Sequence, residues 1–208
     1  FCLCGWHLTV LLFYHKIETM HMLELAYENV NQAFGQLLQF SDKTDEQIYK
    51  REDTVNYLDK VISEYISAAL ATPNLNVNIS QALSSYYLML VDIERISDYA
   101  VNMNHQATKR LQGDMTISEI EIVEHMKKLC VDMKNDLNDV EEAERKDDVI
   151  DSLVSSWRDA QIQALKQQKC SSEVSMMLSR IFTDFERIND HALNVSQELD
   201  KITVEIPD

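Results

Sequence analysis

The sequence predicts an all-α protein made of two tandem three-helix bundles, which together form an elongated six-helix architecture. Three observations carry this prediction. Only three Gly and two Pro occur in 208 residues, so few positions interrupt a helix. Apolar residues recur at helical spacing along most of the chain. The segment 92–102, DIERISDYAVN, returns at 184–194 as DFERINDHALN, which marks two copies of one structural unit.

The first copy is expected to occupy residues 16–113 and to contain three helices. Their expected ranges are 16–40, 44–71 and 79–111. Thr44 and Gln47 have the spacing of a capping box, in which two side chains satisfy the first backbone N–H groups of a helix. The segment 72–78, which contains a Pro and three Asn, is the clearest loop of the chain. The third helix is expected to stop near Gly113.

The second copy is expected to occupy residues 114–202 and to repeat this plan. Its helices are expected at 118–137, 149–165 and 172–200. Ser118 and Glu121 again have capping-box spacing, and one of the serines at 171–172 is expected to cap the last helix. The polar segment 140–146 is interpreted as a short turn. Each bundle is expected to bury its apolar stripe against its own partner helices.

The ends of the chain are expected to lie outside the bundles. Residues 203–208 are interpreted as a tail, and residues 1–15 as a linker or the remnant of a membrane segment. The first residue is Phe rather than Met, which suggests a piece of a longer protein. The apolar run at 6–14 is far shorter than the ~20 residues that a membrane-spanning helix needs.

The charge of the chain narrows the classes of partner. Thirty-five acidic residues stand against 19 basic ones, which gives a formal net charge of -16. Nucleic acid and anionic membrane surfaces are repelled by such a field, so no nucleic-acid partner is expected. Cations or basic protein surfaces fit better.

The repeated segment places two carboxylates four residues apart in each copy, so both lie on one face of a helix. These pairs are Glu94 with Asp98 and Glu186 with Asp190. The repeat continues into the preceding helix, where segment 51–58 aligns with 146–153. It adds Glu52 with Asn56 and Asp147 with Asp151. Neighbouring like charges repel unless a cation lies between them, and oxygen ligands suit hard cations such as iron(III), manganese, magnesium or calcium.

A second interpretation of these stripes is a solvated acidic face. In that case Arg95 or Arg187 would pair with nearby carboxylates for a modest gain. The recurrence of the same residue types in both copies favours a metal site. Asn56 stands where Asp151 stands in the second copy, and an amide is a poorer cation ligand than a carboxylate. The second bundle is therefore predicted to be the stronger site.

Enzymatic chemistry is not expected from this chain. Asp92 and Asp184 lie on a different face from the carboxylate pairs and are expected to be peripheral. His191 follows the second pair, but Tyr99 takes its place in the first copy, which argues against a catalytic histidine. Glycine-rich nucleotide motifs are absent, and the Glu-x-x-His pairs of carboxylate-bridged di-iron proteins are absent from the carboxylate segments.

The two segments beginning at Glu94 (ERISDYA) and Glu186 (ERINDHA) resemble the repeated Glu-Arg-Ile-Gly-Asp-His-Ala signature of the PhoU family. Ser97 and Asn189 replace the usual Gly. The resemblance covers nearly the whole chain. It implies tandem three-helix bundles that regulate phosphate uptake and bind metal clusters through such motifs. The ligand-like positions it implies are Glu94, Asp98, Glu186 and Asp190, with Glu52, Asp147 and Asp151 in support.

Within the family, the chain looks most like the cytoplasmic C-terminal domain of bacterial sodium/phosphate cotransporters. Residues 72–80 lack the Pro-Val-x-x-Asp-Leu-Arg segment usual in free-standing PhoU proteins. This branch implies tethering to the bacterial inner membrane and a transporter membrane domain as partner, in the same chain or a separate one. The ion would be iron, manganese, magnesium or zinc. A free-standing regulator, a metal-free interaction module and a homodimer remain alternatives.

Overall fold

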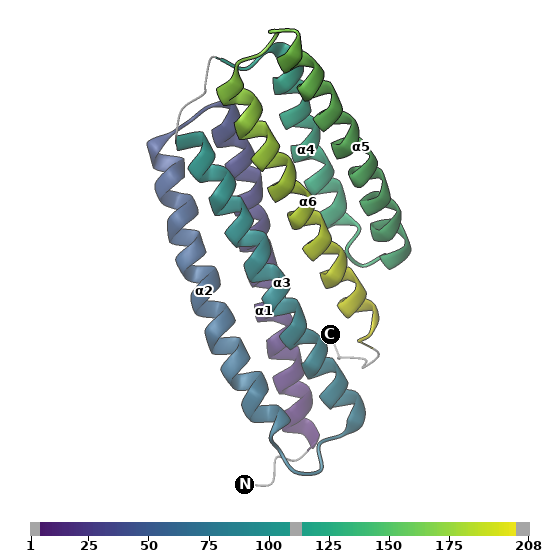
Figure 1. The fold of residues 1–208 in the computed structure, drawn as a ribbon. Helices are drawn as coiled ribbons and strands as arrows, with labels where there is room; N and C mark the ends of the chain where they lie inside the picture. The colour runs from purple at the N-terminus through teal and green to yellow at the C-terminus, as the bar shows by residue number, and fades with distance from the viewer. Residues whose placement is uncertain (1–4, 109–113, 203–208) are drawn as a thin grey trace.

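The computed structural model describes residues 5–108 and 114–202, with side chains from Leu12 onward, and arranges them as six helices that run up and down (Figure 1). The helices are α1 (Gly5–Leu38), α2 (Asp42–Leu70), α3 (Val77–Thr108), α4 (Ile117–Asn135), α5 (Val140–Lys166) and α6 (Ser172–Asp200). The prediction of an all-α protein with two sets of three helices is confirmed. The predicted end of the third helix near Gly113 and the tail at 203–208 lie outside the described residues.

Helix α1 begins at Gly5 rather than at residue 16, so the linker expected at 1–15 is wrong from Gly5 onward. No Gly or Pro interrupts residues 6–16, and an existing helix gains one hydrogen bond for each residue added. The extension also packs, because Leu12 and His15 are both buried. None of the helices in 5–108 and 114–202 combines the length and apolarity needed to cross a membrane.

Two helices begin upstream of their predicted capping boxes. Ser41 has an extended backbone, and its side chain accepts a hydrogen bond from the backbone N–H of Thr44, which caps α2. Thr116 and Glu119 form a reciprocal capping box at the start of α4, with Glu119 Oε2 2.7 Å from the Thr116 nitrogen. The boxes predicted at Thr44–Gln47 and Ser118–Glu121 are therefore wrong. Each lies inside a helix whose first turn an earlier hydroxyl already caps.

The turn predicted at 140–146 is also wrong, because α5 starts at Val140. Asp139 caps it by accepting a hydrogen bond from the Glu142 nitrogen at 3.1 Å. Acidic side chains in the first turn complement the helix dipole, so a polar segment is compatible with a helix start. The predicted cap of α6 is confirmed at Ser171.

Helices α3 and α6 lie side by side in the middle of the molecule, and α1 contacts α4 beside them. Within the described residues, α2 contacts only α1 and α3, while α5 contacts only α4 and α6. The two outer helices therefore belong to one bundle each, whereas the inner helices join the two bundles (Figure 1).

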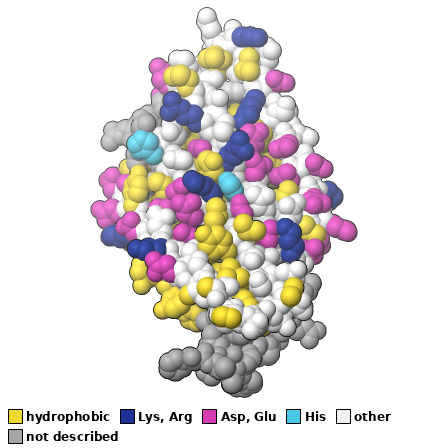
Figure 2. Space-filling view, turned by 60° about the horizontal axis from the view of Figure 1, so that its bottom comes forward, with side chains coloured by type: hydrophobic (Ala, Val, Ile, Leu, Met, Phe, Trp, Pro, Cys, Tyr) yellow, Lys and Arg dark blue, Asp and Glu magenta, His cyan; other side chains and the backbone are white. Residues whose placement is uncertain are grey.

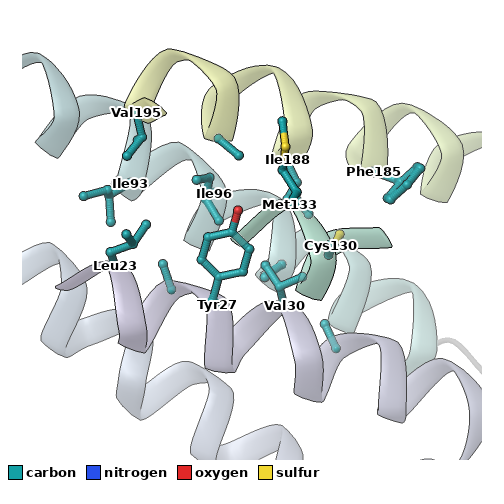
Figure 3. Packing of buried hydrophobic residues seen from close by; sticks show 14 of the residues in the cluster. Leu23, Tyr27, Val30, Ile93, Ile96, Cys130, Met133, Phe185, Ile188 and Val195 are labelled. Atoms are coloured by element: carbon teal, nitrogen blue, oxygen red, sulfur yellow. The ribbon is translucent and has the colours of Figure 1, made fainter. Parts of the chain in front are cut away.

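The apolar core is continuous across the two bundles. Figure 3 shows Tyr27 of α1 among Ile96 of α3, Cys130 of α4 and Ile188 of α6. All four belong to one cluster of buried residues. Each bundle therefore buries its apolar stripe against its own partner helices, as expected, and also against the other bundle. A helix in the middle of six must be apolar on two sides, and α6 has the buried residues to meet this requirement from Val174 to Val195.

An aromatic contact in the core joins the two bundles. Phe34 of α1 and Phe185 of α6 meet edge to face with their ring centroids 6.3 Å apart, and both are fully buried. Such a contact adds to the large area that each ring removes from water.

The substitution Phe185→Ala is expected to lower the free energy of unfolding by about 3–5 kcal/mol, because it leaves a cavity where the two bundles meet. Urea denaturation measures the loss. Because the two bundles share one core, hydrogen exchange of the Phe185→Ala variant should show that the backbone amides of α2 and α5 lose protection together. Loss of protection in α5 with α2 unchanged would contradict a single cooperative unit.

Candidate functional site

In each bundle a basic residue anchors the outer helix to the first helix, directly before the first carboxylate. Arg51 Nη1 donates to Asn29 Oδ1 at 2.6 Å, which joins α2 to α1. Its counterpart Lys146 donates to the backbone oxygen of Asp132 at 2.7 Å and so joins α5 to α4. These anchors fix the register at which the following carboxylates, Glu52 and Asp147, meet the neighbouring helix.

The first cluster comprises the side chains Glu52, Asp59, Glu94 and Asp98 on α2 and α3. Glu52 is 8% exposed, and its Oε2 accepts a hydrogen bond from the Ser97 hydroxyl. The Ser97 oxygen in turn accepts from Asn29 Nδ2 at 3.2 Å. A buried polar chain thus leads from the α1 anchor to the Glu52 carboxylate. The serine that departs from the family signature therefore has a defined structural role.

The carboxylates of the first cluster disfavour one another's charge. Burial raises the pKa of Glu52, and the nearby Asp98 and Glu94 raise it further, against the hydrogen bond from Ser97. Burial also raises the pKa of Glu94, with Asp98 and Asp59 adding to the effect while Arg95 opposes it. These couplings place the groups close enough to repel.

The second cluster comprises Asp147, Asp151, Glu186 and Asp190 on α5 and α6. Burial raises the pKa of Asp147 to about 6, and the neighbouring Asp151 and Asp190 contribute to the rise. The carboxylates of the outer and inner helices therefore lie near one another in both copies.

Glu186 differs from the rest of the second cluster because it pairs with a basic residue of the outer helix α5. Arg158 Nη2 of α5 lies 2.6 Å from Glu186 Oε2 and also donates to the Thr183 hydroxyl at 3.1 Å. This pair is partly buried, with 35% and 26% of the two side chains exposed. In the first cluster its counterpart Glu94 lies 3.6 Å from the more exposed guanidinium of Arg95, which is the next residue along α3.

Exposed ion pairs accompany the second carboxylate of each motif, as the solvated-face interpretation predicts. Arg95 lies 3.3 Å from Asp98, and Arg187 lies 3.2 Å from Asp190. Pairs this exposed contribute little to stability. They leave the carboxylates accessible, and Figure 2 shows acidic side chains gathered on both sides of the middle of one face of the molecule.

One buried carboxylate oxygen in each cluster, at matched positions of the repeat, indicates whether the cluster suits a cation. Glu52 Oε1 and Asp147 Oδ1 are both buried and have no hydrogen-bond partner. An unpaired buried carboxylate oxygen is costly, and either a proton or a cation satisfies it. The carboxylate oxygens of both clusters are thus of the ligand type that a hard cation prefers. Within the described residues, however, no three His, Cys, Asp or Glu side chains converge closely enough to hold a metal as they stand.

Two residues of these clusters were missed by reasoning from the sequence. Asp59 lies two turns after Glu52 on the same face of α2, and this seven-residue spacing could have indicated it. Its counterpart is Val154, so the comparison of the repeats pointed away from it. Arg158 was hidden in the same way, because its counterpart is Ser63.

The acidic residues outside the clusters behave as peripheral groups. Asp92 of α3 lies 2.7 Å from His191 Nδ1 and accepts from Asn194 at 2.9 Å, both on α6. The His191 ring stacks on Tyr99 at 5.8 Å. These contacts join the copies rather than extend the carboxylate stripe. Asp184 is the counterpart of Asp92, and burial raises its pKa to about 6.

Comparison with known proteins matches the PhoU domain twice along the chain, at residues 19–107 and 117–199. A curated relative, the phosphate-specific transport system accessory protein PhoU homolog 1 of Thermotoga maritima, is 25% identical over 199 residues. The match covers 88% of this chain and 83% of that protein.

Two solved structures share the fold. The crystal structure of PhoU from Pseudomonas aeruginosa superposes with a TM-score of 0.83 at 19% identity, covering 93% of this chain and 97% of that one. The phosphate transport system regulatory protein PhoU from Streptococcus pneumoniae gives 0.83 at 20% identity, covering 97% and 99%.

The substitution Asp147→Asn is expected to stabilise the protein at about pH 7.5 by on the order of 1 kcal/mol, a figure reduced because solvent reaches the group. The pKa of Asp147 is about 6 when folded against an ordinary 3.8, so its charged form is disfavoured by folding. The penalty is present above the folded pKa and fades as the pH falls to about 4. Urea denaturation across this pH range measures it.

Asp159→Asn, which alters an exposed carboxylate on the same helix, serves as the control and should change little at any pH. A gain for Asp147→Asn that does not depend on pH would contradict the assignment of a raised pKa.

Proposed function

Because the chain belongs to the PhoU domain family, we propose that it is a non-enzymatic regulator of phosphate transport. The observation that carries this proposal is the match of the PhoU domain to both copies of the repeat, each with its own carboxylate cluster. The curated relative is named as an accessory protein of a phosphate-specific transport system.

A free-standing PhoU-type regulator is better supported than the cotransporter domain expected from the sequence. The curated relative and both solved structures are PhoU proteins, and the chain covers 83%, 97% and 99% of them. The sequence near residue 72, which favoured the cotransporter branch, falls in the short α2–α3 connection. Such connections vary readily between relatives and carry less weight than helices that match throughout.

The regulator would act at the cytoplasmic face of the bacterial inner membrane, on the membrane domain of a phosphate transporter in a separate chain or in the same one. Its net charge of -16 argues against nucleic acid as a partner. A homodimer is compatible with this proposal. Control would be conformational, through contacts that change with the occupancy of the clusters.

The clusters would hold a divalent or trivalent cation such as iron, manganese, magnesium or zinc. Glu52, Asp59, Glu94 and Asp98 would bind it in the first bundle, and Asp147, Asp151, Glu186 and Asp190 in the second. A bound cation would neutralise the mutual repulsion of these carboxylates and join the outer helix to the inner one. Side chains would have to turn toward each other, because no three of them converge as they stand in the described residues.

The first cluster is as strong a candidate as the second, although the sequence favoured the second. Asp59 supplies a carboxylate that compensates for Asn56 in the first bundle. In the second bundle Arg158 lies 2.6 Å from Glu186, which is a closer pair than the 3.6 Å between Arg95 and Glu94 in the first bundle. We therefore expect the first cluster to contribute at least as much to cation binding.

A metal-free interaction module is the second candidate function, and the lack of converging ligands among residues 5–108 and 114–202 favours it. The two candidates differ in what cations do. A module held together without metal should show the same thermal stability with and without them.

The double substitution Glu94→Gln with Asp98→Asn is expected to reduce bound manganese or iron by at least half, because it removes two ligands of the first cluster. Elemental analysis of protein purified without chelator measures this content. Glu186→Gln with Asp190→Asn should have an equal or smaller effect, since Arg158 already occupies Glu186. Glu46→Gln with Glu64→Gln, two exposed α2 residues outside the cluster, controls for the change in net charge.

The metal-binding proposal is wrong if the wild-type protein binds no iron, manganese, magnesium or zinc and if none of these ions changes its thermal unfolding midpoint. This result would leave the regulatory proposal standing, now as a metal-free module.

Expression of the chain in a bacterium lacking its own PhoU protein is expected to restore control of phosphate uptake, measured with radiolabelled phosphate. The Glu94→Gln with Asp98→Asn variant should restore it poorly, and the Glu46→Gln with Glu64→Gln control should restore it fully. If the rate of phosphate uptake is the same with and without each of the three proteins, although each is folded and abundant, the regulatory assignment is contradicted.

A further inference from the structure

A groove opens on the second bundle between the end of α5 and the beginning of α6. Its volume is about 290 Å³, and its floor includes Phe182, which is 1% exposed. Ile162, Leu165 and Met176 line it with 49%, 40% and 62% of their surfaces exposed. The size lies at the lower end of ligand pockets, roughly 300–1,000 Å³, and suits one or two inserted side chains.

The internal repeat explains why the second bundle is hollow here. Ser179 of α6, which lines the groove, stands at the position of Tyr87 in α3. Ser175, also in the lining, stands at the position of the fully buried Leu83. The same helix surface therefore carries two bulky side chains in the first copy and two small hydroxyls in the second. The first copy shows that this fold accepts an aromatic side chain at this place.

The chain segment that forms the groove is richer in basic residues than the protein as a whole. Between Arg158 and Arg180 the chain carries four basic and two acidic residues, against 19 and 35 in the whole chain. Arg158 is paired with Glu186. Lys166, Lys169 and Arg180 make no ion pair within the part of the chain that the structure describes, although Arg180 lies near enough to Asp184 to oppose the rise in its pKa.

We propose that this groove docks an acidic amphipathic helix of a partner protein, which inserts one bulky apolar or aromatic side chain between α5 and α6. The exposed apolar walls bind the apolar face of that helix, and the unpaired cations meet its carboxylates. A flat bilayer surface fits less well, because the apolar area is concave and the chain as a whole repels anionic lipid. This site is distinct from the carboxylate clusters and does not depend on bound metal.

The test uses the full chain and a defined probe. The probe is a fluorescent amphipathic peptide of about 15 residues, composed of Glu, Ala and Leu with one central Tyr, long enough to form a helix. Fluorescence anisotropy gives the dissociation constant, and amide NMR shifts locate the site. We expect binding with shifts concentrated at residues 158–165 and 172–182.

Ser179→Tyr fills the groove with the side chain of the first copy and should weaken binding about tenfold or more. Ser175→Leu is the second filling variant, should Ser179→Tyr fold poorly by circular dichroism. Lys166→Glu with Arg180→Glu should weaken binding by a similar factor. Tyr87→Ser, the matched change in the first copy, should leave the dissociation constant unchanged.

No binding by the wild-type protein, equal binding by the filled variants, or shifts elsewhere on the molecule would overturn the proposal. A second experiment with vesicles containing phosphatidylglycerol tests whether the groove binds a membrane surface instead of a protein. The vesicles should not sediment the protein, and sedimentation of wild type and Ser179→Tyr alike would assign the basic patch to a membrane surface instead.

Discussion

The antiparallel packing of α3 against α6 is the contact on which the rest of the structure depends. It brings Phe34 and Phe185 together across the two bundles and continues one apolar core from α1 to α6. The same two helices carry the repeated acidic motif. Because their inner faces are fixed in the core, the motif carboxylates must point outward, toward the outer helices α2 and α5. The position of both clusters is therefore set by core packing rather than by the carboxylates themselves.

This arrangement lowers the stability of the folded protein, because it holds carboxylates of like charge close together. Glu52 and Asp147 are held against the inner helices by the neighbouring Arg51 and Lys146, which bond to α1 and α4. Each then keeps one buried oxygen without a partner. A fold selected only for stability would replace such groups with apolar side chains. Their presence at matched positions in both copies is the reason why we propose that they bind a cation.

The sequence predicted the helices, the duplication and the carboxylate pairs because these depend on local spacing. It did not predict that α1 begins at Gly5 and α5 at Val140, each at least two turns before the predicted start, because a segment without Gly or Pro and a polar first turn are both compatible with a helix. The merged core also could not be read from spacing, because a helix buried on two sides differs only slightly from an amphipathic one. Asp59 and Arg158 escaped detection because each has an unlike counterpart in the other copy. Comparison of repeats finds what the copies share and misses what distinguishes them.

Crystals grown with manganese test the central claim most directly, by anomalous diffraction at the manganese edge. The account predicts an anomalous peak between α2 and α3, within bonding distance of Glu52, Glu94 and Asp98, with a second peak of equal or lower height between α5 and α6. Electron density showing both clusters without a peak, and Glu52 still bonded only to Ser97, would contradict it.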